Sequence, residues 1–183
     1  MKKILLLSAL LCAISVKLFA QSNTTASQDA GTTSIALDAG LPVGSSSNAY
    51  SVAIGADLRY TIPVAPSAAI TISAGYTELI GKDFVVSYSD GNSSGTIAGR
   101  ANNIGVVPVK VGAKFGAIGT TGFFGEAQLG AAFISQGVGT AFAYSPGIGY
   151  AFDSGFEAGV RYEGWVKNGT VGQVALRLAY SLR

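Results

Sequence analysis

The sequence predicts an all-β fold, an eight-stranded antiparallel up-and-down β-barrel that spans a membrane, on three observations. Only 12% of the 183 residues are charged and the mean hydropathy is +0.42, which is high for a water-soluble chain. After the N-terminal segment, no apolar run approaches the ~20 residues that a transmembrane helix needs. Instead, apolar and polar residues alternate with the period of two that is typical of strands, and the 25 glycines disfavour helices.

The N-terminal segment differs from the rest and is predicted to be a secretory signal peptide over residues 1–20. Lys2 and Lys3 precede an apolar run, and the letters "LFA" predict cleavage after Ala20. The single cysteine, Cys12, lies in this run, so the mature chain has no cysteine. It is therefore expected to be exported and to be stable without disulfides.

The mature chain is expected to have a polar, flexible tail at residues 21–33 and one barrel domain at residues 34–183. The tail, "QSNTTASQDAGTT", consists mostly of small polar residues. Removing the three lysines of the signal leaves nine basic residues against ten acidic ones, a net charge of about −1. Nothing in this balance favours a nucleic-acid partner.

Eight segments of alternating polarity follow, each about as long as a tilted membrane-crossing strand. They cover residues 34–44, 50–63, 67–78, 107–116, 122–133, 140–152, 155–165 and 171–183. In the first four, the apolar face carries Ile35, Leu37 and Leu41, then Ile54, Leu58 and Ile62, then Ile70 and Ile72, then Val109, Val111 and Phe115.

The last four segments repeat this pattern. Their apolar faces carry Phe123, Leu129 and Phe133, then Phe142, Tyr144 and Ile148, then Phe156, Val160 and Tyr162, then Val174, Leu176 and Leu178. Phe124 is the one exception to the alternation in the fifth segment. Aromatic residues near the segment ends are suited to girdles at the two membrane interfaces.

The connections alternate in length. Those after even-numbered segments are short, and the one long connection, residues 80–103, follows the third segment. Periplasmic turns of membrane barrels are short and extracellular loops are longer. Both termini are therefore expected in the periplasm and the long loop outside the cell.

The face opposite the apolar one carries five acidic and five basic residues. Charges enclosed in a barrel must be paired or hydrated, and an equal number of each sign permits pairing. These residues are therefore predicted to form a charge network in the lumen, made of Asp38, Asp57, Arg59, Lys110, Lys114, Glu126, Glu157, Arg161, Glu163 and Arg177. In a soluble exported ligand-binding barrel, which is the alternative, the same charges would face water.

The strand "VPVKVGAKFG", the segment "GFFGEAQLGAAF" and the closing "QVALRLAYSLR" give the chain a family resemblance over about residues 34–183. It resembles the small outer-membrane β-barrel superfamily of Gram-negative bacteria, whose best-known architectures are OmpX and the transmembrane part of OmpA. The resemblance implies a location in the cell outer membrane. It also implies contact with outer-membrane lipid and, during biogenesis, with the barrel-assembly machinery.

The mature chain lacks the residues on which most barrel enzymes depend. It has neither histidine nor cysteine, so imidazole general bases and His or Cys metal sites have no candidates. We expect no enzymatic activity, no cofactor and no metal.

The function predicted from the sequence is structural or surface-interacting, with the long loop as the contact. Within it, "FVVSY" has strand character and "SDGNSSG" favours a turn, so the loop is either a solvated surface loop or a protruding hairpin. The predicted contact residues for a surface protein or glycan are Phe84, Tyr88, Asp90 and Arg100. A porin-like small channel, or a transporter of apolar solutes, is the alternative, because the sixth segment places no charge in the lumen.

Overall fold

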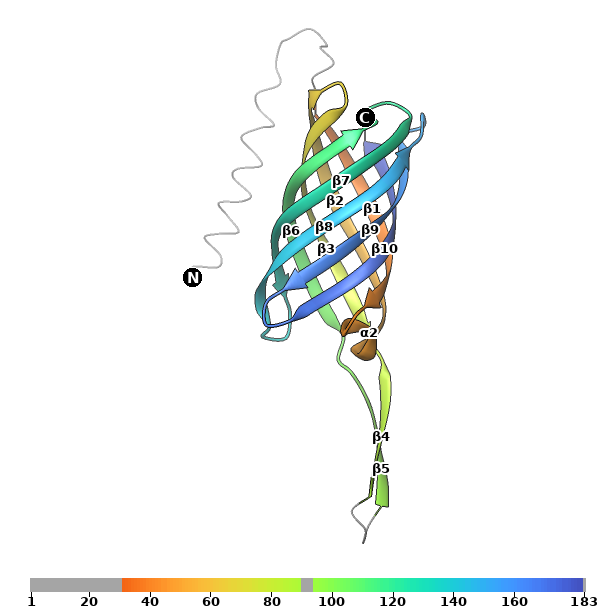
Figure 1. Cartoon of the computed structure of the whole chain (residues 1–183), viewed down its shortest axis with the longest axis vertical. Helices are drawn as coiled ribbons and strands as arrows, with labels where there is room; N and C mark the ends of the chain where they lie inside the picture. Colours follow the sequence, from red (N-terminus) through yellow and green to blue (C-terminus); the bar gives the residue numbers. More distant parts are fainter. Residues whose placement is uncertain (1–30, 90–93, 183) are drawn as a thin grey trace. The chain divides into compact units, whose positions relative to one another are not determined.

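The computed structural model describes residues 31–89 and 94–182 (Figure 1). The predicted signal peptide, residues 21–30 of the predicted tail, and Asp90 lie outside the described residues. Within the described part of the chain, no helix has the length and apolar character needed to cross a membrane.

Eight strands close into one antiparallel barrel in the order β1-β10-β9-β8-β7-β6-β3-β2 (Figure 1). Each strand pairs with its neighbour in sequence, apart from the β4–β5 insertion, and β1 closes the barrel by pairing with β10. The predicted fold class is therefore confirmed. The strands are β1 (Thr32–Val43), β2 (Tyr50–Ala65), β3 (Ala68–Gly81), β6 (Ile104–Gly116), β7 (Gly122–Ile134), β8 (Gly139–Ala151), β9 (Phe156–Val166) and β10 (Thr170–Leu182).

The strand boundaries differ from the predicted ones by up to three residues. β1 begins at Thr32, two residues inside the predicted tail, because Thr32 and Thr33 pair with Thr61 and Tyr60 of β2. β3 and β6 extend toward the long connection, to Gly81 and from Ile104 respectively. Those extra residues continue the antiparallel pairing, with Leu79 opposite Ile104.

The long connection forms a hairpin of β4 (Asp83–Ser89) and β5 (Ser94–Arg100), which pair as a separate two-stranded sheet. The sequence allowed either a solvated surface loop or a protruding hairpin for this segment, and the segment forms the hairpin. The β1–β2 connection holds one helical turn, α2 (Ser46–Ala49). We call the end of the barrel from which β4–β5 extends the hairpin end, and the end with Thr32 and Leu182 the terminal end.

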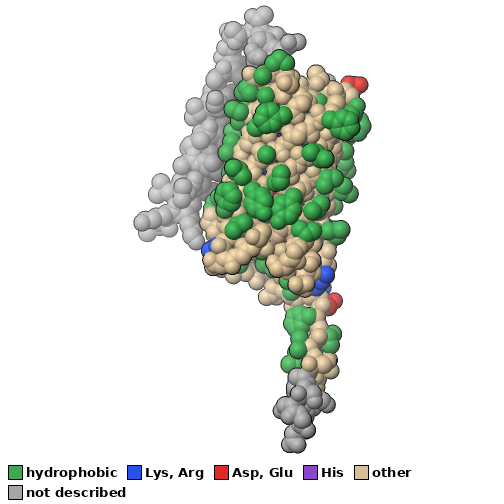
Figure 2. Space-filling model, viewed as in Figure 1, with side chains coloured by type: hydrophobic (Ala, Val, Ile, Leu, Met, Phe, Trp, Pro, Cys, Tyr) green, Lys and Arg blue, Asp and Glu red, His purple; other side chains and the backbone are tan. Residues whose placement is uncertain are grey.

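The outer wall of the barrel is apolar. Leucine, isoleucine, valine and aromatic side chains alternate outward along every strand and are exposed, for example Leu37 at 63% and Ile148 at 72%. Figure 2 shows apolar side chains over the barrel wall, with charged side chains visible only near its ends. In a water-soluble protein so continuous an apolar surface would aggregate, whereas a membrane covers it.

Aromatic side chains gather on the wall at the terminal end. Phe123 packs edge-on against Tyr150 at 5.0 Å, and Phe156 lies 4.8 Å from Tyr180, between ring centroids. Such a girdle is typical of the membrane interface of a barrel.

Candidate functional site

The lumen holds all ten charged residues predicted to face it, and they separate into two groups. Each group takes its members from several strands, because inward-facing positions at one height of the barrel are far apart in the sequence. We call them the terminal-side ion group, consisting of Arg59, Lys114, Glu126 and Glu157, and the hairpin-side ion group, consisting of Asp38, Asp57, Lys110, Arg161, Glu163 and Arg177.

The terminal-side ion group is centred on Arg59, whose side chain is only 1% exposed. Its guanidinium donates to Glu126 at 2.7 Å and also to Glu157. Glu157 accepts a further bond from Lys114 at 2.5 Å. Two cations and two carboxylates therefore balance within this group.

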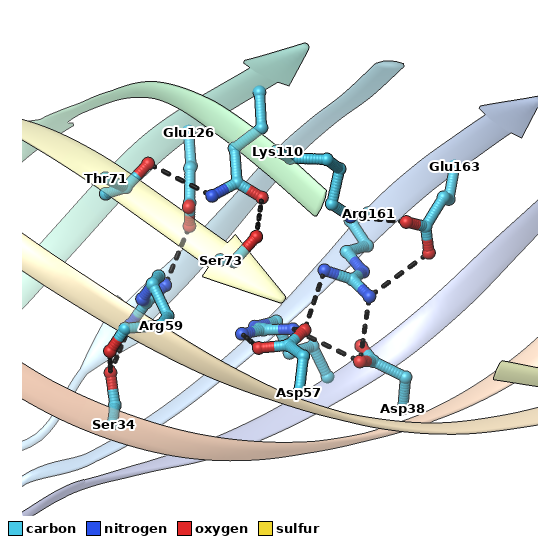
Figure 3. Close-up of polar contacts among 12 residues, drawn as sticks. Ser34, Asp38, Asp57, Arg59, Thr71, Ser73, Lys110, Glu126, Arg161 and Glu163 are labelled. Carbon is cyan, nitrogen blue, oxygen red and sulfur yellow. Dashed lines mark hydrogen bonds and ion pairs between the residues drawn. The ribbon is translucent and has the colours of Figure 1, made fainter. Parts of the chain in front are cut away.

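The hairpin-side ion group is larger and is arranged around two arginines (Figure 3). Arg161 donates to Asp38 at 2.9 Å and to Asp57 at 3.2 Å, and Arg177 donates to Asp57 at 2.5 and 2.7 Å. Glu163, which is fully buried, accepts from Arg161 at 3.1 Å. It also pairs with Lys110.

The hairpin-side ion group has three positive and three negative side chains. It is therefore neutral, like the terminal-side ion group. Each neutral group avoids the large cost of a buried unpaired charge. Uncharged polar residues extend the network: Gln128 donates to Thr71 at 3.1 Å and accepts from Ser73 at 3.2 Å (Figure 3).

An apolar cluster closes the lumen at the hairpin end. Its largest members, Leu79, Val106 and Trp165, are at most 1% exposed. We call this cluster the apolar cap, and it consists of Ala53, Leu79, Val106, Ala132, Ala141, Ala143 and Trp165. This cluster was not predicted from the sequence, although the inward alternation, continued past Thr77 and Glu163, places Leu79 and Trp165 on the lumen face.

The terminal end of the lumen is built differently. Phe124, which interrupted the predicted alternation, faces inward and lies under the Lys114 ammonium group, 3.9 Å from the ring centroid. A recess of about 430 Å³ opens at this end, and Glu157, Asp153 and Thr121 are among its lining residues. The lumen is thus accessible at the terminal end as far as Glu157 and closed by apolar side chains at the other.

A small cavity lies along β8, where the sequence left a narrow polar passage open. Its volume is about 20 Å³, and Ser145, Gly147, Arg161 and Arg177 are among its lining residues. That volume matches roughly one water molecule. It is far too small for a solute path.

The predicted contact residues of the long loop lie on the β4–β5 hairpin, apart from Asp90. Phe84 is 47% exposed, and Arg100 lies 3.8 Å from Asp83 across the hairpin. The backbone of Tyr88 belongs to β4, but its side chain, like Asp90, lies outside the described residues. Among the residues that the structure describes, no cluster of acidic, histidine or cysteine side chains could hold a metal ion.

No family model matches the chain, and no curated protein matches it. Among solved structures, the outer-membrane protein Ail of Yersinia pestis in a phospholipid nanodisc is 17% identical. The match covers 84% of this chain and all of that one, with a TM-score of 0.52. Ail in complex with the heparin analogue sucrose octasulfate is 18% identical over 83% of this chain and 97% of that one, with a TM-score of 0.48. A designed transmembrane β-barrel is 14% identical over 86% of this chain and all of that one, with a TM-score of 0.49.

The chain therefore has the fold of a small transmembrane β-barrel of the outer-membrane type, as the sequence resemblance implied. Its apolar outer wall and its enclosed charges are the surface and interior that such a barrel has in lipid. Together they place the protein in the cell outer membrane, in contact with its lipid.

Proposed function

We propose that this protein is a non-enzymatic integral outer-membrane barrel whose β4–β5 hairpin binds a partner at the cell surface. The hairpin forms the long connection between β3 and β6, and the longer connections of membrane barrels face the outside. The observation that carries the proposal is that the hairpin is amphipathic and exposed, although it lies beyond the strands that lipid covers.

One face of the hairpin is apolar. Phe84, Val86 and Ile97 share it, because Val86 lies opposite Ile97 and Phe84 opposite Gly99. Their side chains are 47%, 52% and 58% exposed. The other face carries the Asp83–Arg100 pair together with Val85.

A two-stranded sheet of this kind is marginally stable by itself in water, and a third strand or a packed face stabilises it. The free edges of β4 and β5 can accept an extended segment of another protein by backbone hydrogen bonding. An extended peptide with alternating apolar residues would bury Phe84, Val86 and Ile97 at the same time. A surface protein is therefore the partner class that we propose.

The test uses peptide selection, because a random library samples many sequences and so requires no candidate partner. A displayed random-peptide library is selected on cells carrying the full-length protein and counter-selected on cells carrying a variant without residues 84–99. We expect enrichment of peptides with alternating apolar residues. A heat-dependent shift on SDS gels, which folded barrels show, confirms that the deletion leaves the barrel intact.

Two variants of the hairpin make the test specific. The triple change Phe84→Ser, Val86→Thr and Ile97→Thr removes the apolar face and should lower peptide affinity at least tenfold. The matched control, Val85→Thr on the other face, should leave it within twofold. No enrichment, or equal loss in both variants, would contradict the proposal, and enrichment on a glycan array instead would point to a glycan partner.

The non-enzymatic part of the proposal rests on chemistry. The sequence contains no histidine, and its one cysteine lies in the predicted signal peptide. The ten charged residues of the lumen are engaged in ion pairs. None is thereby left as an obvious acid or base for a substrate.

The channel alternative is weaker on two observations. The apolar cap closes one end of the lumen, and the cavity beside β8 has room for roughly one water molecule. Purified protein in vesicles should therefore not raise the efflux of small ions above that of protein-free vesicles. Efflux that increases in proportion to the amount of protein would support the channel alternative.

A further inference from the structure

The turn between β9 and β10 carries the one Asn–Gly pair of the sequence. Val166 and Thr170, at the ends of the two strands, pair with each other, so the turn consists of Lys167, Asn168 and Gly169. All three are exposed, and the turn lies at the hairpin end of the barrel. Because glycine has no side chain, its backbone nitrogen can approach the preceding asparagine side chain more closely than that of any other residue.

The backbone of this turn differs from the usual Asn–Gly hairpin turn. Asn–Gly pairs commonly form a type I′ turn, in which both residues have a positive φ. The β7–β8 connection has positive φ at two successive residues, 59° at Gln136 and 77° at Gly137. Among the described residues, neither Asn168 nor Gly169 has a positive φ. The Asn–Gly pair is therefore not locked in the tight conformation of a type I′ turn.

The two groups of this pair that can react with each other are free. The backbone bond of the turn runs from the Lys167 N–H to the Gly169 carbonyl at 3.1 Å. Within the described part of the chain, neither the Gly169 N–H nor the Asn168 side-chain amide takes part in a hydrogen bond. An added side chain at Gly169 meets nothing within 4 Å, so no neighbouring segment packs against the turn at this residue.

Asn103 shows the opposite situation. Its side-chain carbonyl accepts a hydrogen bond from the Gly81 N–H at 3.0 Å, and the next residue, Ile104, begins β6. The stiff, branched side chain of Ile104 and its place in a strand hinder its nitrogen from reaching the Asn103 side chain. Asn103 is therefore an internal reference for the reactivity of Asn168.

We propose that Asn168 and Gly169 form a site of spontaneous covalent modification, at which the asparagine becomes isoaspartate or aspartate. The Gly169 backbone nitrogen attacks the side-chain amide carbon of Asn168. A nitrogen–carbon bond forms, the bond to the amide nitrogen breaks, and ammonia leaves with the proton that the Gly169 nitrogen loses. Water then opens the five-membered imide at one of its two carbonyl carbons, which gives isoaspartate or aspartate.

The modification changes the charge of the barrel rim at the hairpin end. The product has a carboxylate where the side chain was neutral, next to Lys167 in the sequence. The Lys167 ammonium group reaches the β7–β8 connection, where it donates to the Val138 carbonyl. Isoaspartate also lengthens the backbone of the turn by one carbon atom, which the open surroundings of Gly169 accommodate. The site is independent of the β4–β5 hairpin, and the barrel should stay folded after the reaction.

The test follows the full mature chain, folded in phosphatidylcholine vesicles, during incubation at neutral pH. Trypsin cleaves after lysine and arginine, so it releases residues 168–177 and residues 101–110 as separate peptides. Mass spectrometry measures the conversion of amide to carboxylate in each peptide, and electron-transfer fragmentation distinguishes isoaspartate from aspartate. We expect conversion at Asn168 to be at least tenfold faster than at Asn103, with isoaspartate as the main product.

A difference of less than tenfold between the two positions would overturn the proposal. Conversion to aspartate alone would do the same, because direct hydrolysis of the side chain gives no isoaspartate. The same measurement on the chain unfolded in urea tests the contribution of the fold. Conversion at Asn168 in the folded barrel should be within fivefold of that in the unfolded chain, and a slower reaction would mean that the turn protects this pair and that the proposal is wrong.

Two glycine variants locate the reaction. Gly169→Ala places a methyl group on the attacking residue and should slow conversion at least tenfold, while the open space around Gly169 accommodates the methyl group. The matched control is Gly125→Ala on the outer wall, where an added side chain also meets nothing within 4 Å. It should leave conversion at Asn168 unchanged. The heat-dependent gel shift shows that both variants are folded, and unchanged conversion in Gly169→Ala would overturn the attack by the Gly169 nitrogen.

Discussion

At both ends of the lumen, side chains alternate between the inside and the outside of the barrel. The inward side chains at the two ends differ in their chemistry. From the apolar cap to the terminal end, ten charged side chains fill the space as two neutral groups, first the hairpin-side and then the terminal-side ion group. At the hairpin end, the apolar cap fills it with Leu79, Val106, Trp165 and small residues. Ion pairs require partners in particular places on several strands, whereas apolar packing requires only the right volume.

The largest expected effect is the loss of a carboxylate from the hairpin-side ion group. Glu163→Ala leaves Lys110 without its ion-pair partner and removes one from Arg161. We expect a loss of about 3–5 kcal/mol in the free energy of unfolding, the usual result of breaking a buried pair. This loss is measured by urea unfolding in detergent, with the heat-dependent gel shift reporting the folded fraction at each urea concentration.

The matched control for Glu163→Ala is Asp83→Ala, because that carboxylate is 84% exposed and lies 3.8 Å from Arg100 on the hairpin. It should change the free energy of unfolding of the barrel by less than about 0.5 kcal/mol, because exposed ion pairs contribute little to stability. A loss below about 1 kcal/mol for Glu163→Ala would mean that water hydrates the group and that the lumen is wetter than its burial indicates.

The second-largest expected effect distinguishes the stability of the barrel from its impermeability to ions. Trp165→Ala removes the largest side chain of the apolar cap, which should cost about 3 kcal/mol through the cavity that it leaves. Vesicles should nevertheless stay impermeable to small ions, because both ion groups still fill the rest of the lumen. Phe142→Ala, which truncates a half-exposed side chain on the lipid side, is the control for lost aromatic area. Ion efflux that appears only in Trp165→Ala would show that the cap, and not the ion groups, seals the barrel.

These two parts of the lumen were not equally predictable from the sequence. Period-two alternation predicted all eight barrel strands and the inward face of every lumen charge, because one register fixes the face of a whole strand. It did not predict which charges pair. Arg161 contacts Asp38 and Asp57 from strands more than a hundred residues away, and only barrel closure brings them together.

The apolar cap was missed for a different reason. Leu79 and Val106 each lie one residue beyond the predicted end of their strand, beside the long connection of residues 80–103. Trp165 lies at the predicted end of its segment, but an apolar residue on the inward face did not match the polar lumen that was expected. The sequence did not decide between the hairpin and a solvated loop because an isolated two-stranded sheet is only marginally stable in water, even where its residues favour strands.

The smallest effect concerns Phe124, the one aromatic residue that the terminal-side ion group uses. Phe124→Leu keeps an apolar side chain in place but removes the ring face under the Lys114 ammonium group. We expect a loss of about 2 kcal/mol, as for a cation–π contact that is buried from water. Phe115→Leu, on the outer wall, serves as the control for the same exchange in lipid.

A double-mutant cycle shows whether the cation is responsible. In a Lys114→Met background, the ring no longer faces a charge, so the penalty of Phe124→Leu should fall to less than half. An unchanged penalty would mean that Phe124 acts by filling volume, as the residues of the apolar cap do. In that case the chemical difference between the two ends would lie in the ion pairs alone, and the terminal end would share the packing principle of the cap.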